Sequence, residues 1–539
     1  MAAGTGLPLH AGRYSGGRPC LADGWSLNRL TPPSRLFGAN GLRTGPDGRV
    51  YIAQVTGSQI SALDLTTGQL ETITAKGGDI VAPDDVAFDP SGNLYATEVM
   101  DGRVSALDAA GHVRVLRDDV ASANGITFHR GRLFVGECRE GGRLLELDLA
   151  GGPPRVLLEG VPFPNAMEVG PDGLLYFPVM GANEIWRINP EGGEGQRVAA
   201  DLGVPDAVKF DSSGRLVSTQ LHSGQVLRID PRNGERTVLA TLDPGLDNLT
   251  FVGRRLLVSS FTGEITEVLP GGQARTVLPA GLNWPLDLAV GADGSLYIAD
   301  GTYFYVSPPM TGSLRTVGML FSPGYPGFLR GVTCAGAGEF VVTTSNGQVA
   351  RYVPEHNQSD VLAEGFDQLY GVAIAPGGTI VVAELGAGRV LSIRPGPSGP
   401  NVEVLASGLG DPVGVAIAPD GACLVTEAAA GRLVKVGTGT MLDGLQRPQG
   451  VLVLDEQLYV VDAGAKELVA FDPRTGARCT IASNLPVGAP PGVIPKPLLG
   501  MPPFSGPQGP FAGIAAGFDG TLYVSADAEG SVLAIRQET

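Results

Sequence analysis

The chain of 539 residues is poor in the side chains that most often form cross-links or bind transition metals. It contains only five cysteines and five histidines. The cysteines are odd in number, far apart and without a CxxC pair: Cys20, Cys138, Cys334, Cys423 and Cys479. This pattern argues against a disulfide framework and against a zinc site built from thiolates.

Long hydrophobic runs and clusters of positive charge are also missing. No segment approaches the roughly 18 consecutive apolar residues of a membrane-spanning helix, and residues 1–20 lack the apolar core of a secretory signal. The net charge is −17 with no basic run, which disfavours a nucleic acid or an anionic membrane as a partner. We therefore expect a cytoplasmic protein that acts on a small molecule, and its oligomeric state stays open.

Glycine and proline, in contrast, are abundant, with 80 and 42 residues, yet 43% of the chain is hydrophobic. A disordered chain would be less hydrophobic, so short strands joined by tight turns fit better. A repeat supports this reading: residues 85–98 read DVAFDPSGNLYATE, and residues 414–427 read GVAIAPDGACLVTE. Each repeat gives two strands around a Pro-Asp-Gly-like turn, followed by two more strands, which is typical of a propeller blade.

Twelve such units predict an all-β fold of two six-bladed β-propellers in tandem. A 5+7 division or one larger ring are the alternatives. We expect a tail at 1–20, a first propeller at 21–270 and a second at 271–539. Ser34–Phe37 and Ala274–Leu278 resemble outer strands that begin each ring, while residues 531–536 end the last repeat on its third strand. Each ring then closes by pairing its own two ends. Residues 303–328 and 485–510 interrupt the repeat and are expected to be surface loops.

One register of the repeat differs sharply between the two halves. At the start of each innermost strand the first half carries only Asn and Asp, which we call the polar ring: Asn40, Asp84, Asn124, Asn165, Asp206 and Asp247. The second half has neither residue at the equivalent positions: Leu286, Arg330, Tyr370, Val413, Gln449 and Ala512. We take this asymmetry as the main functional signal in the sequence.

Three aspartates that face one another across a narrow channel would repel and be partly desolvated, and a bound cation relieves both costs. Carboxylate and amide oxygens suit a hard ion, Ca²⁺ before Mg²⁺ or Mn²⁺. The plainer alternative is that each Asn or Asp only caps the turn that enters a strand. The second ring lacks these oxygens, so we expect it to bind no metal and to act as a scaffold or lid.

The loops after the second strands share a face with the polar ring and offer acid–base groups. Glu98, Glu137 and His222 are the candidates. Glu384 and Glu427 occupy the same position in the second ring, so Glu98 and Glu137 are open to reading as ordinary strand ends. His222 is open to reading as an exposed loop residue, although a histidine there would titrate near neutral pH.

At these residues the first half resembles the gluconolactonase / senescence marker protein / luciferin-regenerating enzyme family and, more distantly, the paraoxonases. In that family an Asn, an Asn and an Asp surround a catalytic divalent metal, and Asn124, Asn165 and Asp206 occupy those places. The family's glutamate in the first blade is replaced by Asn40, for which Asp84 or Asp247 would compensate. The second half resembles NHL repeats.

The resemblance implies a metal-dependent hydrolase that opens a lactone or ester, in which the metal polarises the carbonyl and a carboxylate or His222 activates water. A lyase or isomerase is the rival within enzymes, since the same metal would stabilise an enolate and streptogramin lyases also have propeller repeats. A non-catalytic binding platform is the rival outside them.

Overall fold

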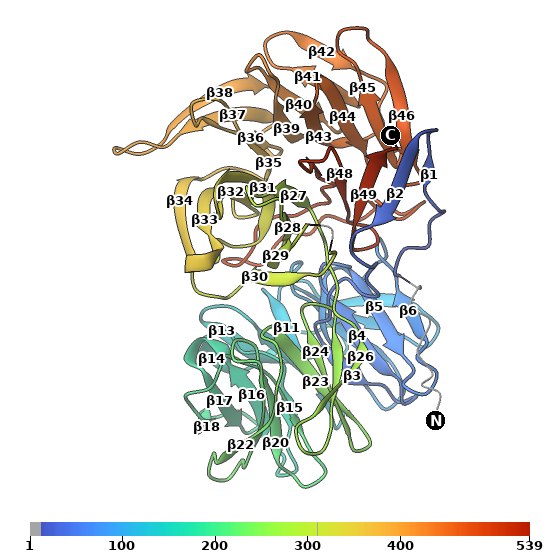
Figure 1. Ribbon diagram of the computed structural model, residues 1–539. Coiled ribbons are helices and arrows are strands. Elements are labelled where there is room, and N and C mark those ends of the chain that lie inside the picture. Colours follow the sequence, from blue (N-terminus) through green and yellow to red (C-terminus); the bar gives the residue numbers. More distant parts are fainter. Residues whose placement is uncertain (1–11, 310, 539) are drawn as a thin grey trace. The chain divides into compact units, whose positions relative to one another are not determined.

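The computed structural model describes residues 12–309 and 311–538, which form two six-bladed β-propellers. Apart from strands, this part of the chain contains only two three-residue 3-10 helices, η1 (Met180–Ala182) and η2 (Pro354–His356). None of its helices is long and apolar enough to cross a membrane. One compact unit is built around Arg35–Gly281, and the other joins Ala11–Ser34 to Leu282–Thr539 (Figure 1).

The first propeller has six four-stranded sheets, each made of four consecutive strands. They are β3–β6 (Leu42–Thr44, Val50–Gln54, Gln59–Leu63, Leu70–Thr74), β7–β10 (Pro83–Phe88, Leu94–Glu98, Arg103–Leu107, Val113–Arg117), β11–β14 (Ala123–His129, Arg132–Glu137, Gly142–Leu147, Arg155–Val161), β15–β18 (Glu168–Val169, Leu175–Val179, Glu184–Ile188, Gln196–Ala199), β19–β22 (Pro205–Phe210, Leu216–Gln220, Gln225–Ile229, Arg236–Thr241) and β23–β26 (Leu246–Val252, Arg255–Ser260, Ile265–Val268, Ala274–Leu278).

The second propeller has four sheets of the same kind and two that recruit a strand from the N-terminal segment. They are β27–β30 (Asp287–Val290, Leu296–Asp300, Tyr303–Ser307, Arg315–Met319), β31–β34 (Leu329–Gly336, Glu339–Thr344, Gln348–Val353, Gln358–Glu364), β35–β38 (Leu369–Ile374, Ile380–Glu384, Arg389–Arg394, Asn401–Ser407), β39–β42 (Pro412–Ile417, Cys423–Glu427, Arg432–Lys435, Gly439–Leu442), β43–β46 (Pro448–Leu454, Gln457–Asp462, Glu467–Phe471, Arg478–Ser483) with β1 (Cys20–Leu21), and β47–β49 (Ile514–Ala516, Leu522–Ala526, Ser531–Gln537) with β2 (Trp25–Arg29).

The turns between first and second strands show why the repeat folds into hairpins. In the turn after β7, the Asp89 carboxylate accepts the backbone N–H groups of Ser91 and Asn93, both at 2.9 Å. Gly92 follows at φ +86°, a conformation that side chains rarely adopt. The Pro-Asp-Gly-like signal is thus an Asx turn ended by a left-handed glycine.

The first propeller closes without exchanging a strand. Its last sheet already has its own outer strand, β26, and the inner strand β23 lies against β3 of the first sheet. The Thr44 N–H donates to Thr250 Oγ1 (3.0 Å), and Ser259 Oγ donates to the Asn40 carbonyl (2.7 Å). The prediction that Ala274–Leu278 begins the second ring is therefore wrong, because these residues fill the outer edge of the first ring.

The second propeller closes with a segment from the far end of the chain. The last repeat does end on its third strand, and its free edge pairs antiparallel with β2, Leu27 lying opposite Ile535. Figure 1 shows β1 and β2 in blue beside β46 and β49 in red. The prediction that Ser34–Phe37 is an outer strand of the first ring is also wrong, because these residues are not a strand and Leu36 packs into the first propeller's core.

Residues 12–20, expected as part of a tail, belong to the second unit, and residues 1–11 lie outside the described part of the chain. The Arg13 guanidinium donates to the carbonyls of Asp527 (2.8 Å) and Ala528 (3.1 Å). Arg29 pairs with Glu529 at 2.7 Å. The N-terminal segment is therefore part of the second propeller's last blade.

A truncated chain that begins at Arg35 should destabilise the second propeller and leave the first intact. The truncation exposes the edge of β49 and removes Trp25 and Leu27 from the core that they pack against, a loss of about 3–5 kcal/mol. Hydrogen exchange followed by mass spectrometry should show faster exchange in β47–β49 and unchanged exchange in β23–β26. Faster exchange in β23–β26 alone would contradict this closure.

The two interruptions of the repeat differ in structure. Residues 303–328 were expected to be a surface loop, but they contain β29 and β30, and Tyr303 is only 1% exposed. The aromatic run is a third strand whose rings fill the blade interior. Residues 485–510 do form a loop without named strands, and within it the Gly509 carbonyl accepts a hydrogen bond from the buried Arg330 (2.5 Å).

Candidate metal centre in the first propeller

The first propeller brings the polar ring together at the starts of its inner strands. Five of the six side chains are buried, with exposures from 3% at Asp206 to 8% at Asp84, and Asn40 is half-buried. Asn40 Nδ2 donates to Asp247 Oδ2, and Asn165 Nδ2 donates to Asp206 Oδ1, both at 3.0 Å. Two amide–carboxylate pairs therefore link neighbouring blades around the channel.

Several oxygens of the polar ring remain available to a ligand. The Asp84 carboxylate accepts no hydrogen bond from the described residues, and Asn124 Oδ1 is buried without a hydrogen-bond partner among them. In contrast, Asn165 Oδ1 accepts the Ala166 N–H (2.7 Å) and Asn40 Oδ1 accepts the Val55 N–H (3.1 Å). Asp84, Asn124, Asp206 and Asp247 thus offer the free oxygens, while Asn40 and Asn165 orient carboxylates.

Without a bound cation, burial disfavours the charged form of the three carboxylates. Burial, with a further contribution from Asp85, raises the pKa of Asp84 to about 8. Burial and then the charge of Asp84 raise the pKa of Asp206 well above its ordinary value, and burial followed by Asp206 and Asp84 does the same for Asp247. None of the three forms an ion pair with a Lys or Arg within the described ranges. A cation would lower all three pKa values together.

A metal held here would need amide oxygens as well as carboxylates. No three His, Cys, Asp or Glu side chains in the described part of the chain lie close enough together to hold an ion by themselves. The unpartnered Asn124 Oδ1 supplies the additional kind of donor, and an oxygen-only set fits a hard divalent cation. The donor set of the polar ring therefore fits such an ion.

Cys138 lies beside this ring and was not predicted to do so. It is 4% exposed, and its thiol contacts the Asn124 amide. Burial and then the charges of Asp206, Asp84 and Asp247 raise the pKa of the Cys138 thiol, so the neutral thiol is favoured over a thiolate ligand. In the sequence, Cys138 directly follows Glu137, in a loop on the face that carries the polar ring. This position is the signal from which its place beside the ring could have been predicted.

Further along the channel, three charged side chains form a network that sequence reasoning also missed. Arg43 donates to the carbonyls of Val86 (2.9 Å) and Ile126 (2.8 Å) and pairs with Glu168 (2.8 Å). Lys209 reaches the same glutamate at 3.4 Å. Because these contacts join five of the six inner strands, the network spans the channel below the polar ring.

The structure does not bring Glu98 and Glu137 into the polar ring. Glu98 is fully buried, accepts the Val81 N–H (2.7 Å) and pairs with Arg103. Glu137 pairs with two arginines, at 2.5 and 3.0 Å. In the second propeller Glu384 and Glu427 accept loop N–H groups at 2.8 Å and pair with Arg389 and Arg432. This repeated arrangement favours the reading of Glu98 and Glu137 as structural strand ends.

His222 lies in the loop between β20 and β21, with an exposed side chain. Its backbone N–H donates to the Gly203 carbonyl at 3.1 Å, which fixes the loop. Met180, from the equivalent loop of the preceding blade, accepts the Asn165 Nδ2 through its sulfur at 3.0 Å. The loops on this face therefore do approach the polar ring, as the strand order predicts.

Comparison with known proteins supports a relationship for part of the chain. The family model described as SMP-30/Gluconolactonase/LRE-like region matches residues 25–262, a little under half of the sequence. No curated protein matches. The matched stretch contains the whole polar ring, so the family resemblance and the candidate site coincide.

Solved structures with the same kind of fold come from more than one class of protein. A streptogramin B lyase is 19% identical, with a TM-score of 0.38, over 51% of this chain and 94% of its own. An inactive virginiamycin B lyase from Staphylococcus aureus with quinupristin is 18% identical (TM-score 0.38; 51% and 96%). A protein assigned as a gluconolactonase is 17% identical (TM-score 0.38; 48% and 95%).

Proposed function

We propose that the first propeller is a divalent-metal-dependent hydrolase that opens a lactone or ester of a small molecule at its channel mouth. The observation that carries the proposal is the set of three buried carboxylates without a positive partner, which the second ring lacks. The match of residues 25–262 to the gluconolactonase-like family model supports the same reading. Ca²⁺ is the proposed ion, ahead of Mg²⁺ and Mn²⁺, because all donors are oxygens.

Asn124 would hold the ion together with fewer than three of Asp84, Asp206 and Asp247 at a time, through their free oxygens, because no three carboxylates lie close enough together in the described part of the chain. When bound, it would supply a Lewis acid that polarises the substrate carbonyl and stabilises the oxyanion. Asn165 positions Asp206, since its amide donates to one carboxylate oxygen and leaves the other free. The Arg43–Glu168 network closes the channel below, so the substrate would approach from the face that carries the polar ring.

Two side chains on this face are candidates to take the proton from the attacking water. Asp206 is the proposed base for the attacking water, because Asn165 fixes one of its carboxylate oxygens and leaves the other available to accept a proton. His222 is the second candidate for this proton, as a residue of the exposed loop on the same face. We give Glu98 and Glu137 no catalytic step, because arginines and backbone N–H groups already occupy their carboxylates.

Turnover of a panel of lactones and esters by the full chain, with and without a chelator, tests this proposal. We expect the chelator to abolish turnover and Ca²⁺ to restore it, with metal content measured on the same samples. An Asp287→Asn protein, altered only in the second propeller, serves as the matched control and should respond like the wild type. Turnover that survives chelation would contradict the metal mechanism, and metal binding without turnover on the panel would favour a lyase or isomerase.

A further inference from the structure

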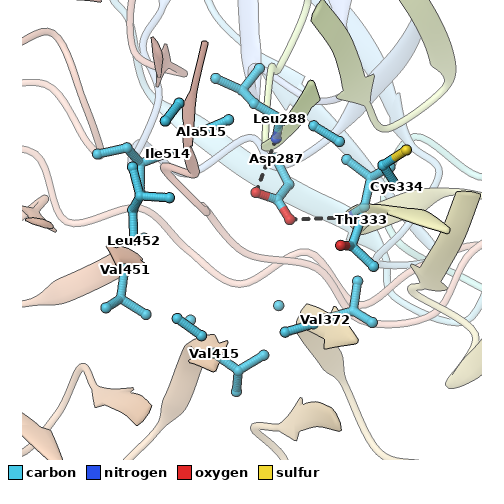
Figure 2. A pocket seen from close by; sticks show the side chains of 18 of the residues that line it. Asp287, Leu288, Thr333, Cys334, Val372, Val415, Val451, Leu452, Ile514 and Ala515 are labelled. Atoms are coloured by element: carbon cyan, nitrogen blue, oxygen red, sulfur yellow. Dashed lines mark hydrogen bonds between the residues drawn. The ribbon is translucent and has the colours of Figure 1, made fainter. Parts of the chain in front are cut away.

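The central channel of the second propeller contains a cavity of about 410 Å³. The residues that line it come from the inner strands of all six blades, and most of their side chains are apolar, as Figure 2 shows for Leu288, Val372, Val415, Val451 and Ile514, while polar groups also contribute to the accessible lining. This volume lies in the range of small-molecule sites, roughly 300–1,000 Å³.

The repeat explains why this channel is hollow where the first is filled. Three residues after the polar ring, the first propeller carries Arg43, Glu168 and Lys209, which form the network across its channel. The same register in the second propeller carries small or apolar side chains, all of which line the cavity: Ala289, Thr333, Ala373, Ala416, Leu452 and Ala515. Short side chains at this register leave the space that a guanidinium and an ammonium occupy in the first ring.

One carboxylate projects into this apolar space. Asp287 is 8% exposed, and its two oxygens accept the backbone N–H groups of Leu288 and Val332, both at 3.0 Å (Figure 2). It forms no ion pair within the described ranges. Burial raises the pKa of Asp287 to about 7, and the two N–H groups only partly oppose this.

The first propeller shows how its own channel compensates an equivalent carboxylate. Asp85 occupies the register of Asp287 and likewise accepts two inner-strand N–H groups, from Val86 (2.8 Å) and Ile126 (3.2 Å). The positive charges of Arg43 and Lys209 oppose the burial that raises the pKa of Asp85. Arg43 pairs with Glu168 and donates to two inner-strand carbonyls, so the cation in this channel offsets the burial of Asp85 through space and not through a direct ion pair.

Two aromatic residues, one near each end of the inner strands, line the cavity. Phe511 lines the inner end and packs on Tyr370 at 5.9 Å between ring centroids, and the Arg330 guanidinium lies 4.2 Å above the Tyr370 ring. At the opposite end the lining includes Phe518, which is 78% exposed. A ligand would therefore enter from the face of the turns between first and second strands.

We infer that the second propeller is a binding site for a small organic cation, an ammonium or amidinium group on an apolar body. The positive group lies beside Asp287 and offsets its burial, as the charges of Arg43 and Lys209 do for Asp85 in the first channel. The apolar body packs against the valine and alanine lining toward the mouth at Phe518. The site is separate from the polar ring and requires no metal.

Binding of phenethylammonium to the full chain tests this inference, with phenethyl alcohol as the neutral probe and 3-phenylpropionate as the anion. We expect calorimetric titration to show the cation binding at least ten-fold more tightly than the alcohol, and the anion not at all. Chelation of metals should leave these affinities unchanged. Equal binding of cation and alcohol, or no binding of the cation, would overturn the inference.

Four variants locate the site. Asp287→Asn should weaken cation binding at least ten-fold, whereas Asp293→Asn, an exposed turn carboxylate of the same blade outside the lining, should not. Ala289→Arg copies Arg43 into the cavity and should abolish cation binding by supplying the charge from the chain itself. Ala416→Leu fills the cavity without changing charge and should weaken cation and alcohol alike, which keeps the test decisive if one variant fails to fold. Undiminished cation binding by folded Asp287→Asn or Ala289→Arg protein would place the ligand elsewhere.

Discussion

Replacing Asp206 with asparagine is expected to lower the turnover of a lactone or ester by about 10²–10³-fold, the usual effect of losing one electrostatic contact in the transition state. The change is nearly isosteric, and an asparagine oxygen can still accept the hydrogen bond from Asn165 that Asp206 accepts at 3.0 Å. It therefore removes charge from the polar ring, and the proposed base, without removing the contact that links the two blades.

Two matched variants separate this effect from general damage. Glu98→Gln weakens an ion pair with Arg103 inside one blade, so it should lower stability more than turnover. His222→Ala alters an exposed loop and should cost less activity than Asp206→Asn, with a changed pH profile if His222 takes the proton. Steady-state kinetics with Ca²⁺ in excess would measure all three. Equal losses for Asp206→Asn and Glu98→Gln at equal metal content would remove Asp206 from its proposed role.

The polar ring could be located from the sequence because equivalent positions can be identified in every repeat. The spacing of about 40 residues places Asn40 and its equivalents at strand starts, and the Pro-Asp-Gly-like turns fix which way each inner strand runs. Inner strands in a ring share one direction, so residues hundreds of positions apart meet around one axis. Asn40 and Asp247, which are hydrogen-bonded in the structure, were predicted to meet on this ground alone.

The closure of the rings was not predictable in the same way. An outer strand pairs along one edge only, and nothing in the segment Trp25–Arg29 shows whether its partner is the next blade or the last one. Ser34–Phe37 is equally short and apolar, but it packs as a loop because the first ring's outer edge is already filled by β26. The choice depends on which edge elsewhere in the chain remains free.

The roles of buried charges depended on partners that local patterns do not reveal. Glu98 looked like a candidate acid on the ring's face, but Arg103 and the Val81 N–H hold its carboxylate within the blade. Arg43, Glu168 and Lys209 lie in three different repeats, and only alignment of all repeats at one register brings them together. The same alignment distinguishes the filled channel from the hollow one.

The stability of the metal-free first propeller should fall as the pH rises toward 8, and Asp84→Asn should relieve this fall. The pKa of Asp84 is about 8 in the folded protein against an ordinary value of 3.8. Below pH 3.8 both states hold the proton and the shift has no effect. Between 3.8 and 8 the unfolded chain releases the proton while the folded chain keeps it, so the free energy of unfolding decreases by up to about 1.4 kcal/mol per pH unit.

Urea unfolding of wild-type and Asp84→Asn proteins in chelator at pH 5 and pH 8 measures this effect. The variant should be the more stable protein at pH 8, and its advantage should shrink at pH 5. With Ca²⁺ the variant's advantage at pH 8 should shrink, because an ion at 100 times its dissociation constant stabilises the wild type by about 2.7 kcal/mol and the variant offers one carboxylate fewer. Asp287→Asn is the control, since the pKa of Asp287 is also raised, to about 7, at a site without other carboxylates in contact.

The difference in stability between that control and the wild type should show the same direction of pH dependence, and it should not change with Ca²⁺, because the Asp287 carboxylate belongs to the channel that we assign to an organic cation. If Ca²⁺ stabilises wild-type and Asp84→Asn proteins equally, the ion binds outside the polar ring. This outcome would contradict the proposed mechanism. If instead the variant gains nothing in chelator at pH 8, the carboxylates of the polar ring are already compensated. The three buried aspartates would then be structural caps of their strands, the plainer alternative that the sequence left open.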